Sequence, residues 1–431
     1  MSAPASSPDS FRPRRTAQGT IVGMPPVVRE HFEPWLREAG FEPIAGGSSG
    51  ADAKPLPLVP GGAIAAVLVR GDVDIAATGT VTSVEGDKVL AFGHPFFGAG
   101  AISIPMANAT ILNTMVSSMR SFKMSATGPI IGEVVQDRLT AIAGVLGRKP
   151  AMLPVDGTMI TPKGKQRFHV DVARDLQLTP RFVAVGSAAA MVGRVEAGDR
   201  GTVRVQGRIE AKGLAPITVR NVYSAERDGS LFVYGAIDVA RAVSLLWDTP
   251  FGPPPQMRVQ IDAEYDPDPA EEWIEAVYLD RSLARPGDAM EVAVQVRRVG
   301  GQVTVERFRV AVPHTWANQE IDIVAAGVEA AETVAMQVAG EPRPTGLRDI
   351  GKWLSERRAD GRIYLLAVRR GSGLKAGVEA HPFLPPSAVV LLGGDPNREQ
   401  RGAGLAWEEA RTRPGIVSGL ARTSIRVESA K

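Results

Sequence analysis

Cysteine is absent from the 431-residue sequence, which excludes disulfide bonds and thiolate chemistry. A zinc site would therefore depend on histidine and carboxylate ligands. None of the five histidines stands in a His-x-His or His-Glu-x-x-His arrangement; they are His31, His94, His169, His314 and His381. We expect neither a metal ion nor another cofactor.

Long apolar runs are also missing. No stretch approaches the ~20 apolar residues that a membrane-spanning helix needs. The N-terminus, MSAPASSPDSFRPRR, has basic residues without an apolar segment after them, so the sequence as given contains no export signal. Neither sign of charge dominates, because 49 basic and 47 acidic residues are spread along the chain. Without a continuous basic face to neutralise phosphates, nucleic acid is not an expected partner.

Aromatic residues are scarce, at 6%, whereas there are 46 glycines and 33 prolines. This composition favours many short strands and turns over long helices, so we predict a mainly β protein. The chain is too long for a single hydrophobic core, which indicates several domains.

The chain is organised around residues 71–100, GDVDIAATGTVTSVEGDKVLAFGHPFFGAG. His94 follows the apolar run Val89–Phe92 and stands between Gly93 and Pro95. The glycine permits a turn that a side chain would block, and the proline fixes the next φ angle. We expect the strand and the turn to hold the imidazole of His94 in a fixed position, as a general base requires. The alternative is a structural histidine at a strand end.

Several ordered motifs surround this stretch. They are Gly71-Asp72, Gly79-Thr80-Val81-Thr82, Ala91-Phe92-Gly93-His94-Pro95-Phe96, Pro105-Met106, Ser121-Phe122-Lys123, Ile131-Gly132, Gln136-Asp137-Arg138 and Gly144-Val145-Leu146-Gly147. In these motifs the chain resembles the SpoIVB-type serine peptidase family, named after the stage IV sporulation protein B protease. The similarity is close over about 60–154 and looser to about residue 313. It implies a peptidase-type fold, a protein or peptide as substrate or partner, and an extracytoplasmic location in the periplasm or cell envelope.

The resemblance assigns His94 as the general base. Asp137 is a second candidate, as the group that orients the imidazole. A local ion pair or a turn cap is the favoured interpretation of Asp137.

The family's serine is not found. In the longer relatives it lies in a G-M-S-G-S-P-like motif ahead of the histidine motif, with the aspartate shortly before it. The nearest analogues here, Gly46–Gly50 and Gly186–Ala188, lack the S-G-S-P core. No Ser-x-x-Lys begins at Ser117, Ser118, Ser121 or Ser125, so a Ser-Lys pair is not indicated either.

Two functions follow from these observations. The first is a SpoIVB-like serine endopeptidase domain protein that is incomplete and inactive as given, with a reading frame that we expect to extend upstream. The second is a non-catalytic cell-envelope binding or scaffold protein built on the peptidase-like fold. Fold similarity alone does not choose between them, and the oligomeric state is not indicated.

The expected organisation has four parts. Residues 1–59 form a flexible leader, a short helix at Val27–Ala39 and a linker. Residues 60–250 form the incomplete peptidase-type domain, which begins with a small β-barrel. Residues 251–340 form a β-sandwich module, and residues 341–431 a small α/β region with a mobile tail from Asp395.

The alternation of apolar residues locates the main strands. The barrel strands are expected near Ala63–Val69, Asp74–Val84, Lys88–Phe92, Ala109–Leu112, Ile130–Val135 and Thr140–Leu146. The sandwich strands are expected at Met257–Tyr265, Val292–Val296 and Val303–Val310, the last with a bulge at Glu306-Arg307. Asp72 with Asp74 is interpreted as a strand-edge pair. The acidic residues Asp266, Asp268, Glu271 and Glu272 are interpreted as a solvated loop.

Overall fold

The computed structural model describes residues 17–38, 41–45, 47–48, 57–115, 122–195, 200–340, 343–376, 379–394 and 398–429. Most of the expected leader and linker lies outside these residues. The chain divides into two compact units. Unit 1 comprises residues 1–156 and 168–195, and unit 2 comprises residues 157–167 and 196–431.

The prediction of a mainly β protein is confirmed, since strands account for 51% and helices for 21% of the structure. Among the described residues, no helix is both long and apolar enough to cross a bilayer.

Unit 1 is built on a closed antiparallel β-barrel, with each of the expected barrel strands present. The barrel strands are β4 (Ala63–Gly71), β5 (Asp74–Glu85), β6 (Lys88–Ala91), β7 (Gly100–Met115), β8 (Phe122–Asp137) and β9 (Ile142–Leu146). They pair in the order β4-β7-β8-β9-β6-β5, and β5 pairs with β4 to close the ring. The β5–β6 hairpin turns at Gly86, whose φ of +61° suits the sharp reversal. Closure leaves no barrel edge unpaired.

Other elements of unit 1 extend this barrel. Strand β1 (Ala17–Val22) pairs with β5 and with β2 (Phe41–Ala45), and β11 (Gly164–Ala173) pairs with β4. The helix expected near residues 27–39 is α1 (Pro26–Glu38), and it packs against α2 (Thr179–Val192). Trp35 of α1 lies edge-on to Phe182 with ring centroids 5.6 Å apart, and Arg181 lies over the same indole.

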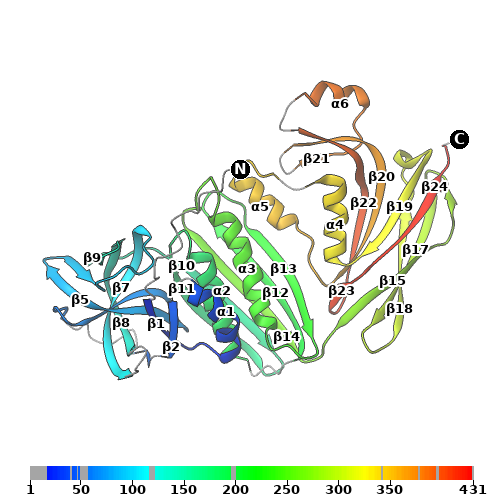
Figure 1. The fold of residues 1–431 in the computed structure, drawn as a ribbon. Helices are drawn as coiled ribbons and strands as arrows, with labels where there is room; N and C mark the ends of the chain where they lie inside the picture. Colours follow the sequence, from blue (N-terminus) through cyan, green and yellow to red (C-terminus); the bar gives the residue numbers. More distant parts are fainter. Residues whose placement is uncertain are drawn as a thin grey trace, which may run out of the picture. The chain divides into compact units, whose positions relative to one another are not determined.

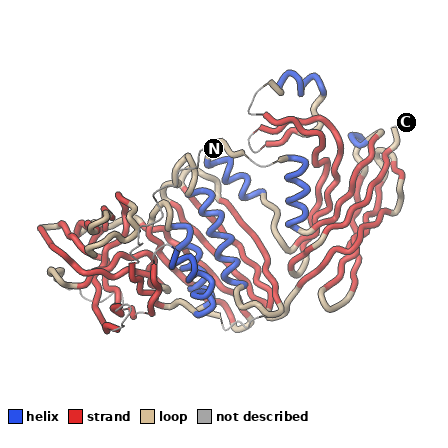
Figure 2. The backbone as a smooth tube through the Cα atoms, viewed as in Figure 1, coloured by secondary structure: helices blue, strands red, loops and turns tan. Residues whose placement is uncertain are grey.

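Unit 2 contains an antiparallel sheet segment of order β13-β12-β14, at one end of a longer sheet. Its strands are β12 (Gly201–Ala211), β13 (Ile217–Ala225) and β14 (Met257–Asp266). Helix α3 (Leu231–Trp247) runs along one face of the sheet (Figures 1 and 2). The helix approaches closely because Gly207 lies under Val239, where an added Cβ would come within 2.6 Å of the valine.

The strand at Met257–Tyr265 was expected in the sandwich, and this expectation is wrong. Its side chains do alternate between buried and exposed, but β14 pairs with β12 along its whole length. The proline-rich break at Thr249–Pro255 therefore turns the chain back from α3 into the same sheet, rather than into a new domain.

A β-sandwich follows, made of two sheets. The first has the order β18-β17-β15-β23 and contains β15 (Glu271–Leu279), β17 (Ala289–Arg298), β18 (Val303–Ala311) and β23 (Ile416–Ser418). The second has the order β16-β24-β19-β20-β21, with β22 also paired to β20. It contains β16 (Leu283–Ala284), β19 (Gln319–Ala326), β20 (Arg362–Ala376), β21 (Glu379–His381), β22 (Arg398–Thr412) and β24 (Leu420–Val427). Buried side chains from both sheets share one core, which includes Val292, Phe308, Trp316, Ile323 and Leu365.

The C-terminal residues complete this sandwich instead of forming a separate α/β region with a mobile tail. Strands β22, β23 and β24 all lie after the expected start of the tail. The polar residues that suggested a mobile tail lie on the outer faces of these strands. The inward-facing residues Val417, Ile425 and Val427 are part of the hydrophobic core. Helices α4 (Val328–Ala339) and α6 (Pro386–Leu392) and the short 3-10 turn His314–Trp316 pack against the sandwich strands, whereas α5 (Leu347–Glu356) packs against β13 and α3.

The bulge expected at Glu306-Arg307 is also absent from the pairing of β18 with β17, which runs without a register shift from Val303 to Ala311. Val303 and Val305 instead face outward and are exposed, while Phe308 and Val310 are buried. The irregularity lies in β15, between Ile274 and Ala276.

Candidate functional site

The strand β6 leads into a strained turn just before His94. Phe92 has a φ of +76° and Gly93 a φ of +68°, so two consecutive residues adopt the left-handed conformation. Glycine adopts it without cost, but phenylalanine does so only where its surroundings hold it. The Phe92 N–H donates to the Thr80 carbonyl at 2.9 Å. Its ring covers Gly79, where an added Cβ would lie 2.2 Å from the ring.

His94 is half-buried, and its two ring nitrogens have different surroundings. Nδ1 lies 2.7 Å from the carbonyl oxygen of Pro95. A carbonyl oxygen only accepts hydrogen bonds, so Nδ1 carries the proton in the neutral ring and Nε2 keeps its lone pair. The ring also lies edge-on to Phe92, with centroids 5.8 Å apart. No residue in the described part of the chain makes a hydrogen bond to Nε2.

Asp137 fixes the loop that follows the histidine. It is the last residue of β8 and is 1% exposed. Its Oδ1 accepts the N–H of Phe96 at 2.7 Å. Its Oδ2 accepts the N–H groups of Phe97, Gly98 and Ala99 at 2.6, 2.7 and 3.2 Å. These contacts are those of a turn cap, and charge-assisted bonds of this kind are about twice as strong as neutral ones.

The orienting contact between Asp137 and the imidazole is not formed. Both carboxylate oxygens of Asp137 are occupied by loop amides, and Nδ1 of His94 is occupied by a main-chain carbonyl. Asp137 therefore acts on His94 through the backbone: it fixes the loop whose carbonyl holds the ring. The Phe96 and Phe97 rings pack together with centroids 4.0 Å apart and add to this support.

None of the described serines makes a hydrogen bond to His94. Ser125 is fully buried in β8, with its hydroxyl 2.7 Å from that of Thr78. Ser187 is fully buried within α2. Ser117, Ser118 and Ser121 lie outside the described residues, as does most of the Gly46–Gly50 segment.

A second polar cluster in unit 1 surrounds His169. Its Nδ1 lies 2.8 Å from Asp156 and its Nε2 lies 3.2 Å from Asp171. Its main-chain N–H donates to Asp72 at 2.6 Å, and Asp72 also pairs with Arg194. Burial lowers the pKa of His169, but the hydrogen bonds and charges of the two flanking carboxylates outweigh it, and the net pKa is raised.

The sequence analysis predicts no role for His169, which lacks the spacing of a metal ligand. Its proximity to Asp171 could have been predicted, because two residues that are two positions apart on a strand share a face. Asp72 and Asp74 hold strand ends, since Asp72 pairs with Arg194 and Asp74 with Arg70 at 3.4 Å. Within the described ranges, no group of three or more histidine and carboxylate side chains has a metal-binding arrangement.

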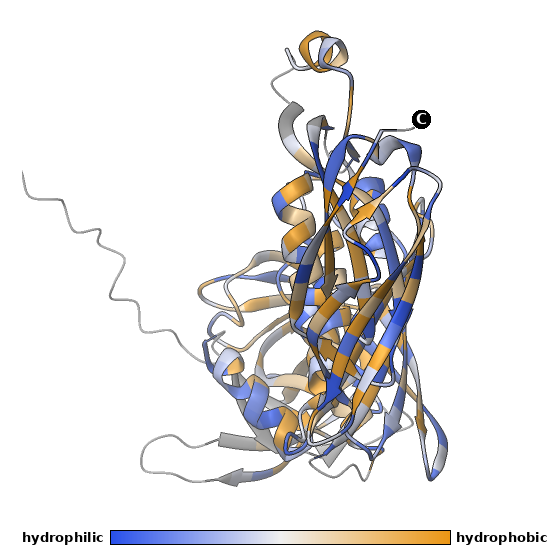
Figure 3. Cartoon of the chain, turned by 90° about the vertical axis from the view of Figure 1, so that its right-hand side faces the viewer, coloured by the Kyte–Doolittle hydropathy of each residue, from blue (hydrophilic) through white to orange (hydrophobic). Residues whose placement is uncertain are grey.

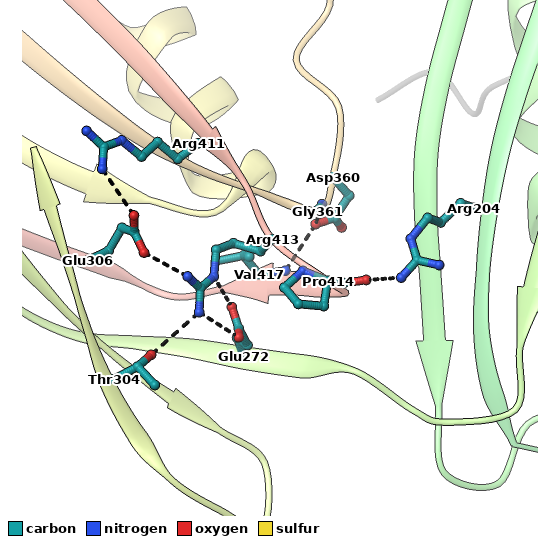
Figure 4. A network of polar contacts seen from close by, with 10 residues as sticks. All are labelled: Arg204, Glu272, Thr304, Glu306, Asp360, Gly361, Arg411, Arg413, Pro414 and Val417. Atoms are coloured by element: carbon teal, nitrogen blue, oxygen red, sulfur yellow. Dashed lines mark hydrogen bonds and ion pairs between the residues drawn. The ribbon is translucent and has the colours of Figure 1, made fainter.

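The main ion-pair network of unit 2 has a structural role (Figure 4). Arg413 donates to both oxygens of Glu272, at 2.6 and 2.9 Å, and to Glu306 at 2.8 Å. Arg411 reaches the other oxygen of Glu306 at 3.1 Å. The hydrogen bond with Glu272 is the main cause that raises the pKa of Arg413. The network ties the end of β22 to β15 and β18. Glu272, expected in a solvated acidic loop, is one of its buried members.

Comparison with known proteins gives no further identification: no family model, no curated protein and no solved structure matches the chain.

Proposed function

We propose that unit 1 carries the base of a SpoIVB-like serine endopeptidase, with His94 as the proton acceptor. The observation that supports this most directly is the bond from Nδ1 to the Pro95 carbonyl. A general base must present a lone pair at a fixed position, and this bond directs the lone pair to Nε2. The capped loop keeps the ring in place, so little reorganisation is needed when a hydroxyl approaches.

The nucleophile in this proposal is a serine outside residues 1–431, in a further segment of the polypeptide or in a partner, because the S-G-S-P core does not occur in this sequence. Both fully buried serines of unit 1, Ser125 and Ser187, are inaccessible to a peptide carbonyl. Residues 1–431 by themselves should therefore not hydrolyse peptides. Removing a triad nucleophile leaves at best a residual acceleration of about 10³–10⁴-fold over water.

A covalent probe tests the proposal. The protein is isolated after expression from its own genomic locus, with any further segment or partner, and treated with a biotinylated fluorophosphonate. We expect the label on a serine outside residues 1–431. We expect the label to be lost in His94→Ala and kept in His381→Ala, which replaces an exposed histidine of unit 2.

Three results would contradict the peptidase proposal. They are a label on Ser125 or Ser187, a label that persists in His94→Ala, and no label under conditions where trypsin reacts. The last result favours the second candidate, a non-catalytic cell-envelope binding or scaffold protein. The outer face of the sandwich supports that candidate, because Trp273 and Tyr278 of β15 are 55% and 57% exposed and available to a partner.

A further inference from the structure

A cavity of about 630 Å³ lies within unit 2, where helix α4 meets the strands β15, β23 and β24. In Figure 1 the helix lies beside β23. Sites for small molecules have volumes of roughly 300–1,000 Å³, so the cavity has the size of a ligand site. Figure 3 shows hydrophobic and hydrophilic residues mixed along the strands of the sandwich, and the cavity walls have the same mixed character.

One wall of the cavity is the indole of Trp273, on the outer face of β15. The residue is 55% exposed, and its Nε1 donates to no group in the described part of the chain. The ring lies against Gly419, where an added Cβ would come within 3.1 Å of it. Gly419 has a φ of +93° and forms the corner between β23 and β24. The indole is therefore held by this corner while much of it stays accessible.

The same corner fixes the start of α4. The N–H of Gly327 donates to the carbonyl of Gly419 at 3.1 Å. The carbonyl of Val417 leaves no room for a Cβ on Gly327, so the helix and β23 are in close main-chain contact. The helix, the corner and the indole thus form one preorganised wall, and binding a ligand there requires little ordering of the protein.

Three exposed polar side chains line the cavity without a partner of their own. Glu329 and Gln337 lie on α4, and Arg422 lies on β24. Among the residues that the structure describes, none of the three makes a side-chain hydrogen bond or an ion pair. Arg413 of the same unit, by contrast, bonds to two carboxylates. The carboxylate, amide and guanidinium groups at the cavity therefore remain available as acceptors and donors.

A fourth polar group at the cavity is the half-buried carboxylate of Asp360 (Figure 4). Its Oδ1 accepts the N–H groups of Gly361 and Val417, at 2.8 and 3.2 Å. Its Oδ2 accepts no hydrogen bond from the described residues. Burial is the main cause that raises the pKa of Asp360, and the negative charge of Glu329 adds to it. Two neighbouring carboxylates thus have unused acceptor capacity.

The charges of the walls restrict the class of ligand. Glu329 and Asp360 oppose an anion, and the unpaired Arg422 opposes a simple cation. Hydroxyl groups both donate and accept hydrogen bonds, so a neutral molecule with several hydroxyls satisfies the carboxylates, the amide and the guanidinium together. The face of an indole carries partial negative charge and attracts C–H groups. A sugar ring presents such C–H groups next to its hydroxyls.

We propose that this cavity binds a neutral saccharide, whose ring stacks on Trp273 and whose hydroxyls bond to Glu329, Gln337 and Arg422. The free oxygen of Asp360 accepts a further hydroxyl. The inference does not depend on the peptidase proposal, because it concerns unit 2 whereas the fluorophosphonate test concerns His94 of unit 1. Either proposal can fail without the other.

Binding of the full chain to a printed glycan array tests the inference. We expect neutral glycans to be bound in preference to sialylated or sulfated ones. In calorimetric titration with a bound glycan, Trp273→Ala and Glu329→Ala should each weaken the affinity about 10- to 100-fold. Trp273→Phe keeps an aromatic ring and should retain most of the affinity. The matched control is Tyr278→Ala, which removes a 57% exposed aromatic ring from the same strand outside the cavity and should leave the affinity unchanged.

Fluorine NMR locates the glycan directly. The chain has six tryptophans, and 5-fluorotryptophan gives one ¹⁹F resonance for each. The Trp273→Phe variant assigns the resonance of Trp273. A saturating glycan should shift this resonance and leave that of the fully buried Trp316 unchanged.

Four results would overturn the inference. They are an array on which the full chain binds no glycan better than Trp273→Ala does, a preference for sialylated or sulfated glycans, an unshifted Trp273 resonance, and an equal loss of affinity in Tyr278→Ala. The last result would place the glycan on the open face of β15 instead of in the cavity.

Discussion

Replacing Asp137 should release the loop that carries His94 while leaving the rest of the barrel folded. The carboxylate accepts four main-chain N–H groups, three of them at 2.6 to 2.7 Å. A hydrogen bond to a charged group contributes about 1.5–3 kcal/mol. The four are not additive, because the N–H groups of the partly exposed residues regain water when the loop opens. We therefore expect Asp137→Ala to lower the free energy of local opening by about 3–4 kcal/mol.

Asparagine is not a conservative replacement at this position. It keeps one oxygen, but its NH₂ group would face N–H donors where Oδ2 now accepts. Asp137→Asn should thus cost nearly as much as Asp137→Ala. The control is Asp87→Asn in the exposed turn between β5 and β6, which should change stability by less than about 0.5 kcal/mol.

Hydrogen exchange followed by mass spectrometry measures this local opening directly. The amides of residues 96–99 should exchange about 10²–10³-fold faster in Asp137→Asn, since each 1.4 kcal/mol is about a factor of ten. In the same variant, ¹⁵N NMR of His94 should lose the pattern of a ring fixed with its proton on Nδ1. Wild-type exchange rates at residues 96–99 in Asp137→Asn would refute the assignment of Asp137 as the loop cap.

Three further predictions concern other sites. The raised pKa of His169 stabilises the fold fully below its ordinary value of 6.5 and loses that contribution as the pH rises through the raised pKa. The contribution should be at most about 1 kcal/mol because the ring is half exposed, and Asp171→Asn should lower the pKa in an NMR titration. Arg413→Ala should destabilise unit 2 by about 3–4 kcal/mol in urea unfolding, because it leaves a buried carboxylate unpaired, whereas the exposed Arg285→Ala should cost less than about 1 kcal/mol. Gly79→Ala should lower the melting temperature and perturb the His94 resonances, because its Cβ would meet the Phe92 ring at 2.2 Å.

Much of the fold follows from periodicity along the sequence. The barrel strands alternate in hydrophobicity and are separated by glycine turns, so local pattern and tertiary pairing agree. Pairing between strands that are distant in the sequence is harder to predict, as β14 illustrates. Its alternation of apolar and polar residues fits either sheet, and only the long-range pairing with β12 determines to which sheet it belongs. The C-terminal strands were misjudged because half of their side chains face solvent, so their average polarity resembles that of a mobile tail.

The position of His94 in the candidate site could also be predicted from local sequence signals. Gly93 and Pro95 mark an unusual backbone around His94, and these signals are local. The carboxylate of Asp137 accepts hydrogen bonds from the main-chain N–H groups of residues 96–99, which lie about forty positions earlier in the chain. Main-chain amides carry no sequence signature, so these bonds could not be predicted. The left-handed conformation of Phe92 could not be predicted either, because it depends on the space above Gly79 on the neighbouring strand.

The contact between Nδ1 and the Pro95 carbonyl sets the kind of base that His94 can be. In a Ser-His-Asp triad the carboxylate both fixes the tautomer and stabilises the imidazolium that forms when the proton is taken up. A carbonyl fixes the tautomer equally well but carries only a partial charge, so it stabilises the imidazolium less. His94 in the described arrangement is therefore oriented as a base without the electrostatic support of an adjacent anion. A serine peptidase built on this loop needs that support from a carboxylate brought with the nucleophile, and the carboxylate must displace the Pro95 carbonyl from Nδ1 or approach beside it. A binding protein needs neither change, because a fixed Nε2 lone pair already suffices to accept a hydrogen bond from a partner.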